Sequence, residues 1–119
     1  MQVNIIKRDI HKETIDYLVN KYVTRKSVWE REVHLPNCAY ECDLYIYNNN
    51  ILDLYEIKTT TGTKQKNKAK LQLQHDKIYV PKLKILQNKD IQLIQLFYVH
   101  SFNKGKYNSE LINRYEMKK

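Results

Sequence analysis

Hydrophobic and polar residues alternate along this chain with two different periods, and each period predicts a kind of element. Between about residues 8 and 22, apolar side chains recur at helical spacing, which predicts a helix that Asp9 could cap. The stretch VWEREVHL at 28–35 alternates with period two and predicts a strand. The stretches 40–47 and 51–59 predict two more strands, because the turn-forming sequence NNN joins them.

The second half of the chain begins with a polar loop and a lysine-rich segment. A helix is expected at about 64–79, and the proline that follows ends it. The apolar run at 90–100 is rich in β-branched and aromatic residues and predicts a buried strand. The tail at 108–119 predicts a short helix with a cap at its first residues. The expected order is therefore α-β-β-β-α-β-α, in a single domain of the α/β (α+β) class that covers residues 1–119.

The composition indicates a globular and basic protein. Hydrophobic residues are 42% and charged residues 29% of the chain, a balance that excludes a disordered polypeptide. The net charge is +8, and between Lys58 and Lys84 there are eight lysines but one acid, Asp76. Such a segment favours a polyanionic partner, most often nucleic acid, although a solvated lysine-rich surface is the alternative. The lysines expected to contact phosphates lie on the second predicted helix: Lys64, Lys66, Lys68, Lys70 and Lys77.

Cysteine use and the lack of long apolar segments bear on the compartment. Cys38 and Cys42 are not spaced as in a zinc knuckle, so we expect free thiols. No run of about 18 apolar residues exists, and the N-terminus lacks the apolar core of a signal peptide. We therefore expect an intracellular protein, cytoplasmic or nucleoid-associated, with no membrane partner. Abundant Asn, Ile, Lys and Tyr fit an AT-rich genome such as that of a virus or mobile element, whose product would act in the host cell.

The central hairpin can be placed in register from its own turn. Asn49 and Asn50 suit the tip of a two-residue type I′ turn, because asparagine tolerates positive φ. In that register Asp43 faces Glu56, and Tyr45 lies on the same face as Asp43. Opposed side chains have Cβ atoms about 5 Å apart, so two carboxylates at these positions repel each other. A divalent cation relieves this repulsion, and Mg²⁺, for which Mn²⁺ can substitute, prefers such oxygen ligands.

Two further groups at the end of the second hairpin strand belong to this candidate site. The backbone carbonyl of Ile57 is a candidate oxygen ligand for the metal ion. Lys58 lies two residues after Glu56 on the same strand face, where it could orient or deprotonate an attacking water. The alternative is that Lys58 forms a cross-strand ion pair with one of the two acids on a solvated face.

Asp43 and the triplet at 56–58 resemble the signature of the PD-(D/E)xK nucleases, which have an acid on one strand and then an acid, any residue and a lysine on the next. The resemblance covers about residues 8–100, and Cys42 stands where the family has its typical proline. It implies a restriction-endonuclease-like αβββαβ core, a central mixed sheet flanked by helices, two acids that bind Mg²⁺, and a catalytic lysine. It also implies DNA as the partner and, because small members often act as dimers, a homodimer.

Some branches of the family have an additional acid near the metal ion. Glu13 is the candidate on the first helix, as in the small Holliday-junction resolvases that the chain resembles, and Glu30 is the rival on the adjacent strand. Gln72 and Gln74 are candidates for positions near the site, although neither has the Q-x-x-x-Y spacing of RecB-like exonucleases to Tyr79. Each of these residues could equally be an ordinary surface residue.

Two functions of different classes agree with these observations. The first is a Mg²⁺-dependent nuclease, most simply an endonuclease, that hydrolyses phosphodiester bonds in DNA. The resemblance to junction resolvases suggests branched, recombination or replication intermediates as its substrates. The second is a non-catalytic nucleic-acid-binding protein that keeps the nuclease fold. The presence of both acids and the lysine favours the nuclease.

Overall fold

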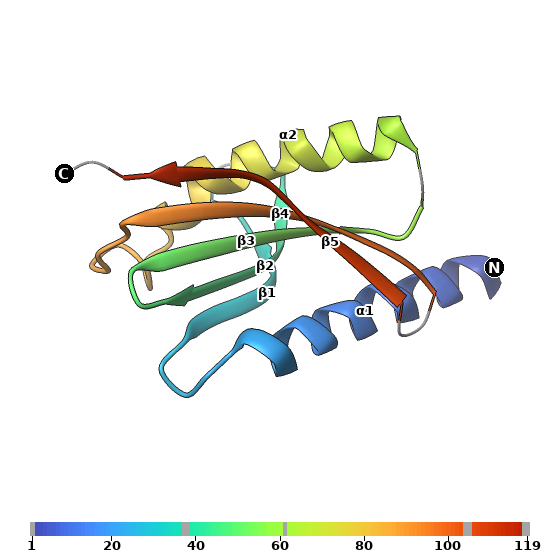
Figure 1. Cartoon of the computed structure of the whole chain (residues 1–119), viewed down its shortest axis with the longest axis horizontal. Coiled ribbons are helices and arrows are strands. Elements are labelled where there is room, and N and C mark those ends of the chain that lie inside the picture. The colour runs from blue at the N-terminus through green and yellow to red at the C-terminus, as the bar shows by residue number, and fades with distance from the viewer. Residues whose placement is uncertain (1, 37–38, 61, 104–105, 118–119) are drawn as a thin grey trace.

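The computed structural model places two long helices and five strands in the residues that it describes (Figure 1). These residues are 2–36, 39–60, 62–103 and 106–117, and side chains are described for 9–36, 39–60, 62–101 and 106–117. In chain order the elements are α1 Gln2–Tyr22, β1 Val28–His34, β2 Glu41–Asn48, β3 Ile51–Lys58, α2 Thr63–Tyr79, the 3₁₀ turn η1 Val80–Lys82, β4 Leu93–Asn103 and β5 Lys106–Glu116.

The strands form one mixed sheet in the order β1-β2-β3-β4-β5. Neighbouring strands are antiparallel except β3 and β4, which are parallel. A parallel pair needs a long crossover connection, and α2 supplies it. Figure 1 shows α2 over one face of the sheet and α1 over the other, so the sheet is the middle of three layers. The fold is therefore α+β, with a five-stranded mixed sheet between two helices.

Each face of the sheet packs its own apolar cluster under a helix. Leu54 of β3 packs with Leu73 of α2 on one face. Tyr55 and Ile57 pack with Ile15 of α1 on the opposite face. Because β3 is covered on both faces, its sequence is a nearly continuous apolar run, and a charged residue within it needs a reason.

Six of the predicted elements are present at the expected places, but the predicted C-terminal helix is wrong. The tail forms strand β5 at Lys106–Glu116, which pairs with β4 along its length. Without β5 the backbone groups along one side of β4 would have no partner in the sheet, and a short isolated helix is only marginally stable. The first helix begins at Gln2 instead of near residue 8.

The turn between β2 and β3 has the predicted geometry. Asn49 and Asn50 have φ values of 51° and 67°, as a type I′ turn requires. The predicted register is confirmed from this turn as far as Leu44, which lies opposite Tyr55. The residues of the turn were therefore sufficient to predict the register of this part of the sheet.

Two expectations about the chain as a whole are met only in part. Cys42 is a free cysteine, as predicted, and it is buried, whereas Cys38 lies outside the described residues. Neither helix of the described ranges is both long and apolar enough to cross a membrane.

Candidate active site

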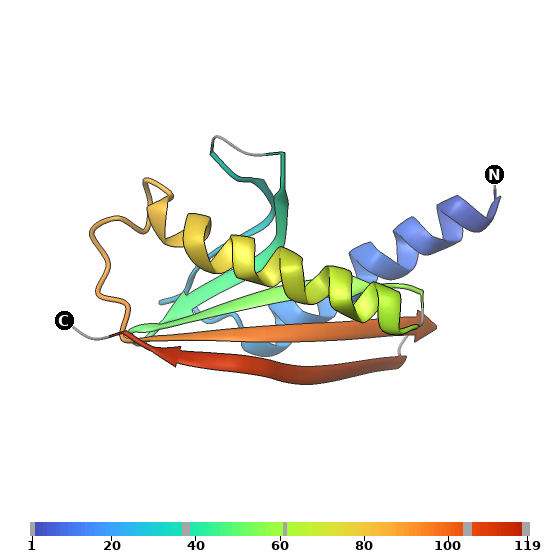
Figure 2. The same cartoon turned by 90° about the horizontal axis from the view of Figure 1, so that it is seen from above.

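The sheet changes its geometry where the two predicted acids lie. The β2–β3 ladder stops at Leu44 opposite Tyr55, so Asp43 does not pair with Glu56 as the register predicted. Instead, the backbone N–H of Ile57 donates to Asp43 Oδ2 over 2.8 Å. Figure 2 shows the far end of the β1–β2 hairpin extending away from the other three strands. Asp43 is thus the first residue beyond the regular ladder, and its carboxylate bonds to the β3 backbone that a neighbouring strand would otherwise satisfy.

The backbone is also irregular on β1, beside the point where β2 leaves the ladder, and we call the two irregularities together the kink of the hairpin. Glu32 has a positive φ of 52°, and the β1–β2 register passes from Arg31 opposite Leu44 to Val33 opposite Cys42 without a pair at Glu32. Positive φ is unfavourable for a residue with a long side chain, so this backbone is held by its surroundings. Both strands of the hairpin leave the sheet at the same level, and the departure opens the end of β3.

Glu56 is the most unusual ionisable residue of the site. It is 6% exposed, its Oε2 lies 3.4 Å from Lys58 Nζ, and its Oε1 has no hydrogen-bond partner among the described residues. Burial, followed by the charge of Asp43, raises the pKa of Glu56 to about 9, while Lys58 opposes the rise. The ion pair with Lys58 is therefore too weak to offset the burial.

Helix α1 brings a histidine to Asp43. His11 Nε2 lies 3.4 Å from Asp43 Oδ2, and the hydrogen bond to Asp43 raises the pKa of His11 although burial opposes it. The sequence predicted no role for His11. Its spacing to Ile15 and Leu18, which are buried against the sheet, is a signal that it points inward.

Helix α2 brings a third carboxyl group. Asp76 has no exposed surface, and its Oδ2 has no hydrogen-bond partner in the part of the chain that is described. Gln72 Nε2 donates to Asp76 Oδ1 over 3.0 Å and to the Glu41 carbonyl over 2.9 Å. Burial raises the pKa of Asp76 to about 7, and the charge of Asp43 adds to the rise. Asp76 is also one of the charges that raise the pKa of Glu56, so the three acids act on one another.

Asp76 was not among the predicted site residues, although the sequence marks it. It is the one acid among the lysines of its segment, and its spacing to the buried residues Ala69, Leu73 and Val80 continues the apolar side of α2. An acid within an apolar stripe must find a partner in the interior.

The other predicted site residues lie in varied places. Glu13 is half-buried on α1. Glu30 is opposite Tyr45, and burial, followed by the charge of Glu30, raises the pKa of that tyrosine. Tyr45 is fully buried in the cluster under α2. Gln74 faces β5, where its Nε2 donates to the Tyr115 hydroxyl over 2.9 Å, so of the two glutamines Gln72 is the one that contacts the acids.

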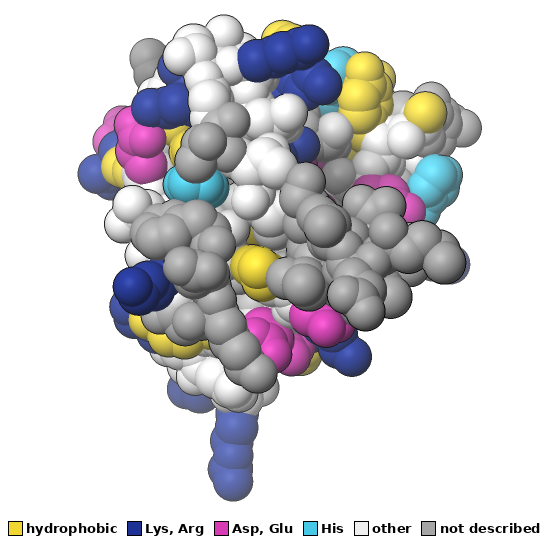
Figure 3. Space-filling view, turned by 90° about the vertical axis from the view of Figure 1, so that its right-hand side faces the viewer, with side chains coloured by type: hydrophobic (Ala, Val, Ile, Leu, Met, Phe, Trp, Pro, Cys, Tyr) yellow, Lys and Arg dark blue, Asp and Glu magenta, His cyan; other side chains and the backbone are white. Residues whose placement is uncertain are grey.

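The lysines of α2 divide into two rows. Lys64 and Lys68, one helical turn apart, lie on the side of the candidate site, where Lys68 lines a cavity together with Lys58. The other row, Lys66, Lys70 and Lys77, faces β5: Lys66 Nζ lies 2.8 Å from Glu110 Oε2, and Lys77 Nζ lies 3.7 Å from the Tyr115 ring centroid. Figure 3 views the end of the molecule that is on the right in Figure 1, and basic side chains gather there toward the top, over α2.

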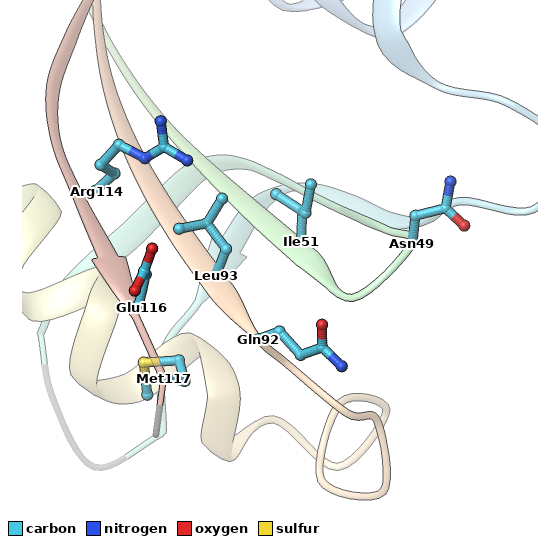
Figure 4. Close-up of a pocket in the computed structure, with 7 residues that line it drawn as sticks. All are labelled: Asn49, Ile51, Gln92, Leu93, Arg114, Glu116 and Met117. Carbon is cyan, nitrogen blue, oxygen red and sulfur yellow. The ribbon is translucent and has the colours of Figure 1, made fainter. Parts of the chain in front are cut away.

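Two cavities differ in size and in place. A cavity of about 310 Å³ adjoins the candidate site and is lined by Tyr40, Lys58, Lys68, Leu71 and Gln72. A larger one of about 670 Å³ lies at the opposite end of β3 and is shown in Figure 4; its lining is Asn49, Ile51, Gln92, Leu93, Arg114, Glu116 and Met117. Of these two cavities, only the smaller one is lined by Lys58, the lysine of the candidate site.

The ligating side chains that the structure describes near the candidate site are few. The described residues contain no group of three or more His, Cys, Asp or Glu side chains arranged to hold a metal ion. Mg²⁺, however, is commonly held by one or two carboxylates with water in the remaining positions. Asp43 and Glu56 are such a pair, and the unpartnered Oε1 of Glu56 is a ready ligand atom. The donor set therefore fits Mg²⁺ and fits softer metals poorly.

No protein-family model matches the sequence, and no curated protein sequence is detectably similar to it. Function is therefore inferred from the geometry and charge of the site itself.

Proposed function

We propose that this protein is a Mg²⁺-dependent nuclease that hydrolyses DNA phosphodiester bonds at Asp43, Glu56 and Lys58. One observation carries the proposal: Glu56 is 6% exposed beside two other acids, and its Oε1 has no partner in the described ranges. A buried carboxyl group that lacks partners destabilises the fold, and nearby like charges add to the effect. A bound divalent cation would offset both penalties, so the arrangement supports a metal-ligating role for the pair.

The order of the elements supports the same proposal. Helix α1, the strands β1, β2 and β3, helix α2 and strand β4 follow in the αβββαβ order that the resemblance to PD-(D/E)xK nucleases implies. The acid of β2 lies where that strand leaves the sheet, and the Glu-x-Lys triplet ends β3. Cys42 remains a departure from the family pattern, and it is buried rather than exposed at the site.

Each residue has a distinct part in the proposed reaction. Mg²⁺ held there would supply Lewis acidity for the activation of water and for the charge on the leaving oxygen. Asp43 and Glu56 would hold that ion, and the hydrogen bond from Ile57 N–H fixes the Asp43 carboxylate. Lys58 lines the cavity next to Glu56, where its ammonium group stabilises negative charge on the phosphate under attack. The water oxygen bonds to phosphorus, the bond to the leaving ester oxygen breaks, and the proton lost by the water is balanced by one gained by that oxygen.

Nucleic acid reaches this site past the Lys64 and Lys68 row. These ammonium groups neutralise backbone phosphates, and counterion release then makes binding depend on salt. We expect Lys64→Ala with Lys68→Ala to flatten the slope of log affinity against log salt by about 1 to 2 units, since about 0.7 to 0.9 is lost per phosphate contact. Lys66→Ala with Lys77→Ala is the matched control, because both side chains are engaged by β5. Equal flattening by both pairs would place the nucleic acid across the whole helix.

A non-catalytic nucleic-acid-binding protein is the second candidate. The observations that favour it are the two groups already bonded to Asp43, Ile57 N–H and His11. The test is cleavage by the purified protein of plasmid, single-stranded DNA, branched DNA and RNA, with Mg²⁺ and with EDTA. Metal-dependent cleavage supports the nuclease. Binding that EDTA leaves unchanged, with no cleavage of any substrate, supports the second candidate.

A further inference from the structure

Three aromatic rings form a stack beside the candidate site. The rings of Tyr40 and His75 have centroids 4.1 Å apart and an interplanar angle of 17°. His75 and Tyr79 continue the stack at 6.4 Å and 13°. Tyr40 precedes β2 at the end of the kinked hairpin, whereas His75 and Tyr79 are one turn apart on α2. The kink that opens the end of β3 therefore also carries Tyr40 onto α2.

The stack is open to solvent and surrounded by apolar residues on a helix that is otherwise rich in lysine. Tyr40 is 41% exposed, and Leu71 and Ile78 on the same helix are 65% and 51% exposed. Large apolar side chains left this exposed mark a surface that binds something flat or apolar. Lys82 Nζ lies 5.4 Å from the Tyr79 ring centroid, so a cation flanks the stack.

The cavity of about 310 Å³ connects this stack to the proposed reaction site. Tyr40 and Leu71 line it on one side, and Lys58 and Lys68 supply two cations to the same space. None of its lining residues is acidic. An aromatic ring, an apolar side chain and two ammonium groups are the groups that recognise a nucleobase and its phosphate together.

We propose that the Tyr40–His75–Tyr79 stack is a base-stacking subsite, and that it makes single-stranded nucleic acid the substrate class of this protein. The inference rests on the proposed function for the identity of the neighbouring site, but not for the binding itself. In a duplex each base is stacked between its neighbours and cannot offer its face to a tyrosine. An unpaired nucleotide can lay its base on Tyr40 while its phosphate lies between Lys58 and Lys68.

A protein partner would also cover exposed leucine and isoleucine side chains. The charges favour nucleic acid, because the cavity is lined by two lysines and no acid and the chain carries a net charge of +8. A second copy of this chain, with the same charges, would bring lysines against lysines on this surface.

The test measures binding in EDTA, where metal-dependent cleavage is absent, with fluorescein-labelled 12-residue probes of oligo-dT, oligo-U, a duplex and an abasic strand. The abasic strand keeps the phosphates and lacks the bases. We expect both single strands to bind more tightly than the duplex, and oligo-dT to bind about fivefold or more tightly than the abasic strand, since stacking on one base contributes about 1–3 kcal/mol. A difference between oligo-dT and oligo-U combines the effect of the sugar with that of the thymine methyl group.

Variants of the full-length protein locate the effect. Tyr40→Leu should remove the preference for oligo-dT over the abasic strand, and Tyr40→Phe should keep it. Tyr22→Leu is the matched control, because Tyr22 is 43% exposed and near Lys21 Nζ, but stacks on Tyr55 on the α1 side. The comparison of strands on the wild-type protein needs no variant, so it remains decisive if Tyr40→Leu does not fold.

Three results would overturn the inference. They are equal binding of the abasic strand and oligo-dT by the wild type, tighter binding of the duplex, and a folded Tyr40→Leu variant that keeps base-dependent binding, with or without a change of self-association in light scattering. A different result would contradict the nuclease proposal alone. Base-dependent binding that needs Tyr40, with no Mg²⁺-dependent cleavage, keeps the subsite and removes the enzyme.

Discussion

The two ends of strand β3 have very different surroundings. At its start, the Asn49–Asn50 turn is regular, and the Asn50 carbonyl accepts backbone hydrogen bonds from Gln92 and Leu93. The larger cavity lies there, at about 670 Å³. At its other end, the ladder breaks at Asp43 and a smaller cavity of about 310 Å³ meets Lys58.

The two ends separate two features that are each used to locate functional sites, unsatisfied buried carboxyl groups and a large cavity. Among the described residues, the buried carboxyl oxygens without a hydrogen-bond partner belong to Glu56 and Asp76. Both have raised pKa values, and both lie near the broken end of the hairpin. A cluster of carboxyl groups with perturbed pKa values is typical of functional sites, and a cavity is a stronger candidate site where such groups converge on it.

Removing one acid from each end gives the largest expected contrast. If Glu56 is a metal ligand as proposed, Glu56→Gln should lower the single-turnover cleavage rate by about a hundredfold or more, because it removes a charge that acts on the transition state. Asp53→Asn is the matched control on the same strand, since Asp53 Oδ1 accepts a hydrogen bond from Gln95 Nε2 over 2.9 Å and faces the other side of the sheet. Equal losses in both variants would show that folding, and not chemistry, limits the rate.

Lys58→Ala tests the other charged group at the broken end. We expect the cleavage rate to fall by about a hundredfold, as for other groups that stabilise charge in the transition state. Binding of Mg²⁺ should survive or tighten, because a positive charge 3.4 Å from Glu56 Oε2 has been removed. The measurement is single-turnover cleavage beside a Mg²⁺ titration of the folded variant. If a folded, metal-bound Lys58→Ala protein cleaves at the wild-type rate, Lys58 has no catalytic role and serves only as the ion-pair partner of Glu56.

The same two ends explain what the sequence could predict. The turn end follows from local rules, namely two asparagines and the alternation of side chains beside them, and its register was predicted correctly. The broken end depends on Glu32, whose positive φ interrupts the β1–β2 ladder, and no local pattern indicates that interruption. The sequence analysis therefore predicted correctly that Asp43 and Glu56 lie close together, but the direct cross-strand pairing on which it based this prediction is absent.

The residues that the sequence missed come from elements distant in the chain. His11 and Asp76 reach the cluster from α1 and α2, on opposite faces of the sheet. Each continues the buried side of its helix, so the signal was a polar residue within an apolar stripe rather than a motif. The C-terminal strand was missed because its pairing with β4 is a tertiary effect that outweighs local helix signals.

The dependence of stability on pH should also be concentrated at the broken end. In the unfolded chain Glu56 releases its proton near its ordinary pKa of 4.5, whereas in the folded, metal-free protein the pKa is about 9. Between these pH values the folded state keeps a proton that the unfolded state has lost, so stability falls as pH rises. The raised pKa values of Asp76, to about 7, and of His11 act with the same sign.

We therefore expect the melting temperature in EDTA to decrease from pH 5 to pH 9. Saturating Mg²⁺ should reduce the decrease, because the cation binds the ionised carboxylates. Glu56→Gln should also flatten the curve, and its difference from the wild type isolates Glu56 from Asp76 and His11. A melting temperature that rises with pH, or a Glu56→Gln curve as steep as that of the wild type, contradicts the raised pKa of Glu56.

The smallest effect is expected at the regular end, and it tests whether that end takes part in function at all. Asn49 has a φ of 51° and lines the larger cavity. Asn49→Ala should lower the free energy of unfolding by about 1 kcal/mol or less, because alanine is disfavoured in the left-handed region, whereas Asn49→Gly should have little effect since glycine adopts that region freely. Chemical denaturation measures both variants. Because the turn lies at the opposite end of β3 from Glu56, neither variant should change the single-turnover cleavage rate. A loss of cleavage in a stably folded Asn49→Gly protein would bring the larger cavity into the function and remove the contrast between the two ends.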